Sequence, residues 1–363
     1  MDDFDRDVYC IGGLPFDAMD LSKTMNRLRD AKHTKKSCFL TTPNLNFLAL
    51  SQQDADFRNS VLYSDFVIAD GAPIVWIAKL LGIPISERVA GSTLFEALGK
   101  EWRRKLTVYF FGGPSGVAAE ASKHINQNST GLNCVGYYSP GFGSLEDMSE
   151  SSIIDNINLS NADFLVVALG AKKGQAWIVK NLPKIKTPLV SHLGAVINFE
   201  ARRLKRAPVR MQKIGLEWAW RIKEEPHLWR RYWGDGWFLL RYLMTNILPY
   251  IIWVKFNRRR LNNLSQKSTV TLDDAGVNIN LVVSGAVLDP VSPNIRSLLR
   301  QASLQNKSVQ LNLADTEYLG FGMLALLLLL KKQLAMQGHQ LKIVQIQPGM
   351  KRLLTWSGLS YLV

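Results

Sequence analysis

The chain has 363 residues, 47% of them hydrophobic and 20% charged, so it is long enough for two globular domains and too apolar to be intrinsically disordered. Its formal net charge of +14 indicates an acidic partner: a nucleic acid, an anionic membrane or a phosphate-bearing substrate. Three widely spaced cysteines, Cys10, Cys38 and Cys134, have no disulfide or metal-binding spacing and are typical of core residues in a reducing cytoplasm.

The N-terminal part of the chain predicts alternating strands and helices. Its first residues are acidic and lack an apolar signal region, so secretion is not expected. Residues 7–11 predict a strand, a glycine- and proline-containing turn follows, and residues 20–32 have the pattern of an amphipathic helix. Residues 41–91 then predict a strand with a polar turn and a helix, a second strand that ends on an acid, another helix, and an arginine.

Four polar residues in this stretch are candidates for a site. Thr42, Asn44, Asp70 and Arg88 each lie in a turn or just after an apolar segment. If the strands are parallel, their carboxyl ends meet at one rim, and the four side chains can converge there. A carboxylate beside a guanidinium could deprotonate a hydroxyl group and hold an anion. The simpler alternative is that Asn44 and Asp70 cap helices and that Arg88 is a solvated surface charge.

Further buried strands follow in the next hundred residues. Residues 106–113 predict a strand closed by Gly112 and Gly113, and a helix starts directly after them. Such a turn could bring backbone N–H groups to a phosphate, or it could be a simple tight turn. Residues 162–170 have the strongest buried-strand pattern of this half of the chain.

Residues 187–199 predict the last strand and turn of this part. His192 lies there, and a lone histidine is expected to be a packed or hydrogen-bonded residue. The whole alternation predicts an α/β fold with a mainly parallel, Rossmann-like sheet and helices on both faces. The chain has no G-x-G-x-x-G motif with an acid at dinucleotide distance, which weakens the alternative of a nicotinamide dehydrogenase.

A series of motifs between residues 8 and 232 resembles the WecG/TagA/CpsF glycosyltransferases. In chain order they are TTPNLNFL, IADGAPIVW, ERVAGSTLF, FFGGPSG, VVALGAKKGQAWI, HLGAVINFEARRLKRAP and GLEWAWRIKEEPHLWRRY. The resemblance implies transfer of a sugar from a UDP-sugar to a polyprenyl-diphosphate-linked sugar, with inversion and with neither an essential metal nor a cofactor. The sugar is expected to be a hexose, such as an N-acetylhexosamine or its uronic acid, used in bacterial cell-surface polysaccharide synthesis.

The resemblance also suggests residue roles. Asp70 is the expected catalytic base, with Thr42, Asn44 and Arg88 binding the substrates. The family has a glutamine–glutamate pair beside the donor. Here Gln175 is present and is expected to bind substrate, but the next residue is Ala176, so catalysis should not depend on a carboxylate at that position.

The composition changes over residues 201–260, which hold 15 Lys and Arg against 4 Asp and Glu, and six of the ten tryptophans. This mixture suits the headgroup layer of an anionic membrane. Residues 237–254 are the most apolar part, but these 18 residues include an arginine, an asparagine and a proline. We therefore expect an interfacial or re-entrant helix pair rather than a span, in a peripheral or monotopic protein at the cytoplasmic face of the inner membrane. Nucleic-acid binding is the competing interpretation, and the aliphatic run argues against it.

In the family this appendage folds over the active site near the membrane and contributes arginines. The matching candidates are Arg206, Arg221, Arg230 and Arg231. They would neutralise the diphosphates of the donor and the acceptor. The alternative is that several of them contact only lipid headgroups.

Residues 261–268 are polar and predict a linker. Residues 269–363 have an order of strands and helices that resembles a STAS domain, a small α/β module, with 277–287 as a hairpin-like strand pair. The position that is often phosphorylated in that family corresponds here to 320–322, which has no hydroxyl group, so docking to a protein partner or self-association is the better interpretation. The apolar run 324–330 is expected to be a buried core helix.

The predicted organisation is a catalytic domain (1–200), a membrane-associating appendage (201–260), a linker (261–268) and a STAS-like domain (269–363). The expected partners are the UDP-sugar, the polyprenyl-diphosphate-sugar and an anionic membrane surface. The alternative function is a non-catalytic scaffold of a polysaccharide-assembly complex that acts through the STAS-like domain.

Overall fold

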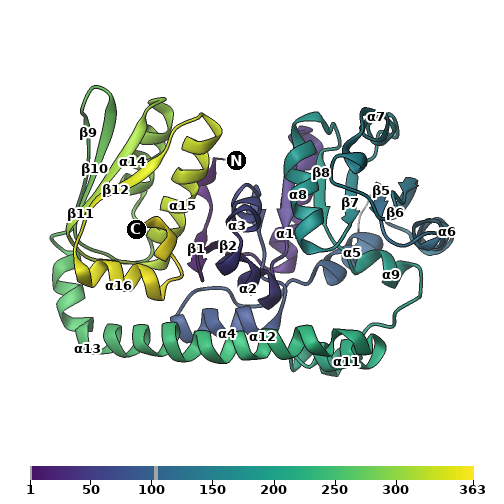
Figure 1. Cartoon of the computed structure of the whole chain (residues 1–363), viewed down its shortest axis with the longest axis horizontal. Helices are drawn as coiled ribbons and strands as arrows, with labels where there is room; N and C mark the ends of the chain where they lie inside the picture. Colours follow the sequence, from purple (N-terminus) through teal and green to yellow (C-terminus); the bar gives the residue numbers. More distant parts are fainter. Residues whose placement is uncertain (1, 102–104) are drawn as a thin grey trace.

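The computed structural model describes residues 2–101 and 105–363 and contains two α/β units that are bridged by one long helix (Figure 1). The first unit has six parallel strands in the order β4-β3-β8-β7-β5-β6, which confirms the predicted sheet. These strands are β3 (Cys38–Thr41), β4 (Phe66–Val67), β5 (Leu106–Gly112), β6 (Leu132–Tyr138), β7 (Phe164–Ala168) and β8 (Leu189–His192).

Helices cover both faces of this sheet, so its central strands are buried on both sides and consist of continuous apolar runs. One face is covered by α1 (Leu21–Thr34), α5 (Gly91–Glu101), α6 (Val117–Asn128) and α9 (Val196–Glu200). The other face is covered by α7 (Ser151–Leu159) and α8 (Ala171–Asn181). Helix α3 (Ala55–Leu62) lies beside α8, α2 (Leu45–Gln53) lies beside α3, and α4 (Ala72–Leu81) follows β4. Because the six strands are parallel, their carboxyl ends lie at the same rim of the sheet.

The predicted first strand lies outside this sheet. β1 (Val8–Ile11) pairs with β2 (Leu14–Asp17) in a separate antiparallel hairpin, so the chain already returns as a strand where only a turn was expected. Gly12 and Gly13 both have positive φ, as a two-residue hairpin turn requires. The Asp17 carboxylate accepts a hydrogen bond from the Val67 N–H at 2.7 Å, which ties the hairpin to the edge strand β4.

The second unit has four strands in the order β12-β11-β10-β9. They are β9 (Thr269–Asp274), β10 (Asn278–Val287), β11 (Ser308–Leu319) and β12 (Leu341–Ile346), and the helices are α14 (Pro293–Leu304), α15 (Phe321–Met336) and α16 (Pro348–Trp356). The stretch that was expected to be a strand pair is the single strand β10. Its antiparallel partner is β9, which precedes it in the chain.

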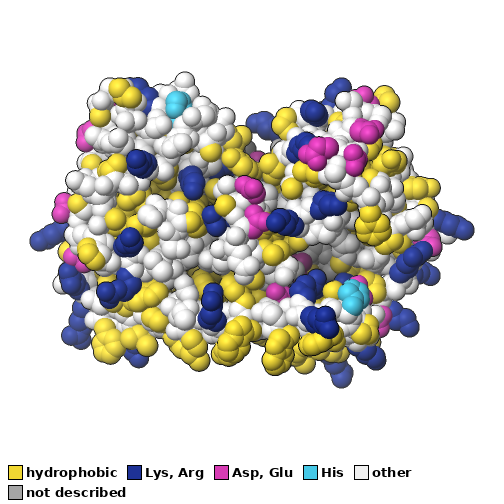
Figure 2. All heavy atoms as spheres, in the orientation of Figure 1, with side chains coloured by type: hydrophobic (Ala, Val, Ile, Leu, Met, Phe, Trp, Pro, Cys, Tyr) yellow, Lys and Arg dark blue, Asp and Glu magenta, His cyan; other side chains and the backbone are white. Residues whose placement is uncertain are grey.

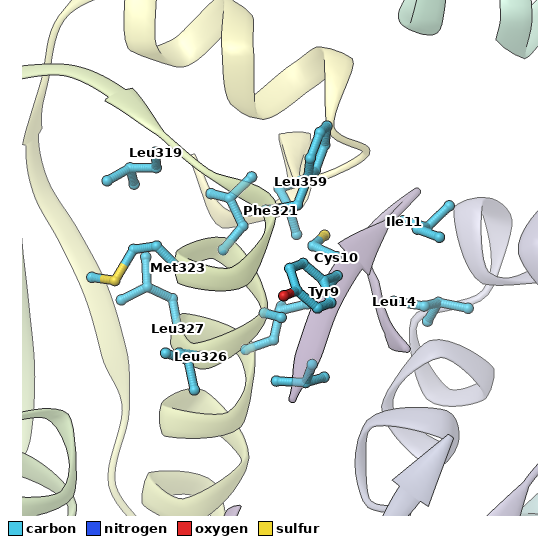
Figure 3. Close-up of a cluster of buried hydrophobic side chains, with 14 of the residues drawn as sticks. Tyr9, Cys10, Ile11, Leu14, Leu319, Phe321, Met323, Leu326, Leu327 and Leu359 are labelled. Carbon is cyan, nitrogen blue, oxygen red and sulfur yellow. The ribbon is translucent and has the colours of Figure 1, made fainter. Parts of the chain in front are cut away.

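Helix α15 is buried between the two units. Residues 324–330 are all buried, as predicted for a core helix. Figure 3 shows Tyr9 and Cys10 of the N-terminal hairpin facing side chains of α15, including Phe321 and Leu326. The two units therefore share one hydrophobic core and are not joined only by a linker.

Polar contacts close this shared core. The ammonium group of Lys332, on α15, is buried and lies 3.1 Å from the Asp3 carboxylate and 3.0 Å from the Ser64 carbonyl oxygen. The Arg296 guanidinium donates to the carbonyl oxygens of Phe4 and Arg6. Because a buried charge is tolerated only when it is paired, these contacts fix how the second unit sits on the first.

Residues Pro226–Ser265 form one continuous helix, not the helix pair that was expected. It consists of a short 3₁₀ turn, α12 (Trp229–Tyr242), a π-helical turn (Leu243–Ile247) and α13 (Leu248–Ser265), so the polar stretch predicted as a linker is helical as far as Ser265. Pro249 has no N–H to donate to the carbonyl group of Thr245, which accounts for a local change of helical pitch there.

One face of this helix packs on both units, and the opposite face carries an exposed apolar stripe. The stripe consists of Trp229, Trp233, Trp237, Leu240, Met244, Leu248, Ile252 and Phe256. At about 100° per residue, the 27 residues from the first to the last would place them on opposite sides of an ideal helix. The π-helical turn reduces the total rotation between Trp229 and Phe256 by about 100°, so the stripe stays near one side of the helix. Figure 2 shows the resulting row of hydrophobic side chains along the edge where Figure 1 places α12 and α13.

Candidate active site

Asp70 lies beyond the carboxyl end of the edge strand β4 and directly before Gly71, the N-cap residue of α4. Its carboxylate accepts a hydrogen bond from the Gly91 N–H at 3.4 Å. The N-cap residue of α4 is Gly71, and no side chain caps that helix, so Asp70 is not a helix cap. Burial raises the pKa of Asp70 to about 6, with Arg88 opposing the shift and Glu217 adding to it. This places the carboxyl group in the range of a general base at neutral pH.

Arg88 is not a solvated surface charge. Its side chain is 16% exposed, and its guanidinium binds the Glu217 carboxylate of α11 (Glu217–Glu224). The positive charge lies close enough to stabilise ionised Asp70. The appendage therefore reaches the rim of the sheet through an acid, Glu217, that the sequence prediction missed although it lies in the quoted motif GLEWAWRIKEEP.

The other two residues of the N-terminal set differ in role. Thr42 is buried at the end of β3, and a side chain at Gly91 would come within 3.5 Å of its hydroxyl oxygen, so Thr42 faces the Asp70 side of the rim. Asn44 caps α2 by accepting a hydrogen bond from the Phe47 N–H at 3.2 Å. The helix-cap interpretation thus holds for Asn44, which nevertheless lies beside Gly71.

The four appendage arginines lie in different places. Arg206 is the one that acts electrostatically on Asp70; it also pairs with Glu96 and donates to the Thr93 hydroxyl group at 2.9 Å. Arg221 pairs with Glu225 and lies over the Phe199 ring. Arg230 and Arg231 are exposed near the start of α12 and stack on neighbouring aromatic rings, so the structure does not bring them to the rim.

Two of the predicted donor contacts are packed away from solvent. Gln175 is fully buried and donates to the Thr41 hydroxyl group at 3.2 Å, which puts it beneath the rim. The Gly113 N–H donates to the Ala168 carbonyl oxygen, and a Cβ atom at Gly112 would lie 2.5 Å from that oxygen. The geometry therefore assigns this turn to close packing of β5 on β7.

A cavity of about 390 Å³ opens next to Arg206, between α5, α6, α9 and the following loop. Its wall contains Glu96, His124 and Glu200. Burial and the neighbouring Glu96 raise the pKa of Glu200 to about 7, while Arg206 lowers it. Within the described residues, no three His, Cys, Asp or Glu side chains come together in a group that could hold a metal ion.

A parallel sheet with a carboxylate and arginines at its rim is an arrangement in which α/β enzymes bind anionic substrates. Residues 9–250 match the glycosyl transferase WecG/TagA/CpsF family, so the chain belongs to this family of glycosyltransferases. Residues 270–363 match the family described as Mlab, STAS domain.

Several curated relatives share the name N-acetylglucosaminyldiphosphoundecaprenol N-acetyl-beta-D-mannosaminyltransferase. A relative from Bacillus spizizenii is 30% identical over 197 residues, which cover 54% of this chain and 75% of the relative. A relative from Bacillus subtilis is 26% identical over 52% of this chain and 72% of its own length. A relative from Staphylococcus aureus strain MW2 is 21% identical over 60% of this chain and 84% of its own length.

Proposed function

We propose that this protein is an inverting glycosyltransferase that moves an N-acetylhexosamine from a UDP-sugar to a polyprenyl-diphosphate-linked sugar. The name of the relatives makes N-acetylmannosamine the first donor sugar to test and an N-acetylglucosamine-diphosphate lipid the first acceptor. The observation that carries the proposal is the half-buried Asp70 carboxylate at the strand rim, held between the Gly91 N–H and the positive charges of Arg88 and Arg206.

In this mechanism ionised Asp70 accepts the proton of the acceptor hydroxyl group as its oxygen attacks the anomeric carbon. The bond between the anomeric carbon and the UDP oxygen breaks at the same time, and UDP leaves with the electron pair. Arg206 and Arg88 stabilise the negative charge that develops on the diphosphate, in place of a divalent ion. Thr42 orients one of the two substrates at the same rim.

The long helix provides the approach to a lipid-linked acceptor. By length and composition it could cross a bilayer, but one face of it packs on both folded units. We therefore propose that it lies along the cytoplasmic surface of the membrane, with the apolar stripe in the interface and the flanking arginines among anionic headgroups. The acceptor diphosphate would then sit at the height of the rim.

The STAS-like domain acts, on this proposal, as a fixed part of the enzyme. Its helix α15 is covered by the N-terminal hairpin of the same chain, so a protein partner would have to bind another face of the domain. The scaffold alternative gains no support from this arrangement, because the rim keeps its base and its cations.

The test compares Asp70→Asn with Asp56→Asn, an exposed acid on α3. Asp70→Asn should reduce transfer by about 10²- to 10⁴-fold, the contribution of a general base, while UDP binding persists. The control variant should keep full activity. Full activity of Asp70→Asn would contradict the assignment of Asp70 as the base.

A further inference from the structure

The cavity beside Arg206 is joined to the rim through the start of α5. The Gly91 N–H binds the Asp70 carboxylate, and the next residue, Ser92, lines the cavity. Arg206 belongs to the cavity wall and also acts electrostatically on Asp70. The volume of about 390 Å³ lies in the range of small-molecule sites. The cavity therefore continues from the rim and has room for part of a substrate.

The order of groups in a UDP-sugar decides which part reaches this cavity. The inference rests on the proposed function, in which the hexose lies at Asp70 and the diphosphate at Arg206. The diphosphate joins the hexose to the nucleoside, so the nucleoside extends from Arg206 away from Asp70. The cavity runs in that direction, because its wall continues from Ser92 to Glu96, one helical turn further along α5, and to His124 on α6.

Glu200, at the end of α9, offers this cavity an acceptor that the fold does not use. Its side chain is 24% exposed, and no described residue donates a hydrogen bond to its carboxylate. Its one ion-pair contact among the described residues is the His124 ring, with Nδ1 3.6 Å from Oε2, which is too long for a hydrogen bond. Burial and the charge of Arg202 lower the pKa of His124, so this ring is neutral at pH 7 and does not neutralise the acid.

The chemistry of the wall fits a nucleoside better than a phosphate group. Two carboxylates, Glu96 and Glu200, would repel an anion, whereas a carboxylate can accept hydrogen bonds from both hydroxyl groups of a ribose. Phe199, the neighbour of Glu200 on α9, adds an aromatic ring to the wall, and such rings pack against nucleobases. The cations Arg202 and Lys205 complete the wall beside Arg206.

We propose that this cavity binds the nucleoside of the donor, with the Glu200 carboxylate accepting hydrogen bonds from the ribose hydroxyl groups and Phe199 packing against the base. These contacts are the same before and during transfer. Glu200 therefore contributes to donor and UDP affinity, and its loss should raise the KM for the donor while kcat changes little.

The test is calorimetric titration of the full chain in detergent with UDP, 2′-deoxy-UDP and inorganic pyrophosphate. The titrations are made at pH 8, above the pKa of about 7 to which burial raises Glu200. The variants are Glu200→Ala and Glu120→Ala. Glu120 is the matched control, an acid on α6 that pairs with Arg203 and lies outside the cavity wall.

The unaltered protein should bind UDP at least about 10-fold more tightly than 2′-deoxy-UDP, the effect of one hydrogen bond to a charged group. Glu200→Ala should weaken UDP binding about 10- to 100-fold and should bind the two nucleotides alike. It should bind pyrophosphate at least as tightly as the unaltered protein, because an acid near Arg206 has been removed. A purely electrostatic role would instead strengthen the binding of all three ligands. Glu120→Ala should bind like the unaltered protein.

Unchanged UDP affinity in Glu200→Ala, or retained discrimination against 2′-deoxy-UDP, would overturn the inference alone. Absence of UDP binding by the unaltered protein would overturn the proposed function and the inference with it. If Glu200→Ala does not fold, photolabelling of the unaltered protein with 5-azido-UDP decides. The label should lie in residues 117–128 or 196–206, which supply most of the wall, and a label confined to other peptides would contradict the proposal.

Discussion

Substitution of Lys332 by methionine should destabilise both units of the protein together. Lys332 belongs to the STAS-like domain, yet its ammonium group is paired with Asp3 and Ser64 of the first unit. Removing one partner of a buried ion pair costs about 3–5 kcal/mol. Asp3 would keep hydrogen bonds from Arg6 at 2.8 Å and from Gln333 at 2.6 Å, so we expect the lower end, about 3 kcal/mol.

The measurement is urea unfolding followed by tryptophan fluorescence, because nine of the ten tryptophans precede residue 269. Lys332→Met should move a single transition to lower urea by about 1 M, at an m-value of about 3 kcal/mol per M. Lys342→Met, at an exposed position on β12, is the control and should change stability by less than about 0.5 kcal/mol. Two separate transitions, with the tryptophan signal unmoved by Lys332→Met, would refute the shared core.

Two further predictions concern the site and the membrane face. The rate of transfer should rise with pH through about 6, because Asp70 must be ionised to accept a proton, and it should fall about tenfold between pH 7 and pH 5; initial rates that stay flat through pH 6 would contradict the role of this carboxylate. Replacing Trp233 and Trp237 together by glutamate should weaken sedimentation with vesicles of anionic phospholipid at least tenfold, whereas Val277→Glu, an exposed apolar position on the β9–β10 turn away from the helix, should leave it unchanged.

The sequence was sufficient to predict the parallel sheet and the position of Asp70 at its rim. Apolar runs such as that of β7 are buried on both faces, and this pattern is typical of central parallel strands. The position of Asp70 could be predicted because an acid that follows a buried parallel strand lies at the rim where the carboxyl ends of the strands meet. Its neighbour Glu217 could not, because the contact to Arg88 joins residues 129 positions apart and no local pattern encodes it.

The arrangement of the C-terminal half was not predictable from local patterns. An apolar run such as 324–330 indicates burial but not what covers it, and here the N-terminal hairpin does so. The polar residues after Arg260 looked like a linker because their helix is held by tertiary contacts, such as the buried Leu261, rather than by strong helix propensity. Gln175 was expected at the donor because the family resemblance implies that role, and a motif does not show whether a side chain lies at the rim or just beneath it, where Gln175 contacts Thr41.

The most direct test of the proposed function is transfer of radiolabelled N-acetylmannosamine from its UDP conjugate to an N-acetylglucosamine-diphosphate polyprenol, in detergent with EDTA present. We predict transfer by the unaltered protein in EDTA, and its loss in Asp70→Asn. Failure of every UDP-sugar in a hexosamine panel to support transfer, by protein that is folded and offered this acceptor with and without added divalent ions, would contradict the proposed activity.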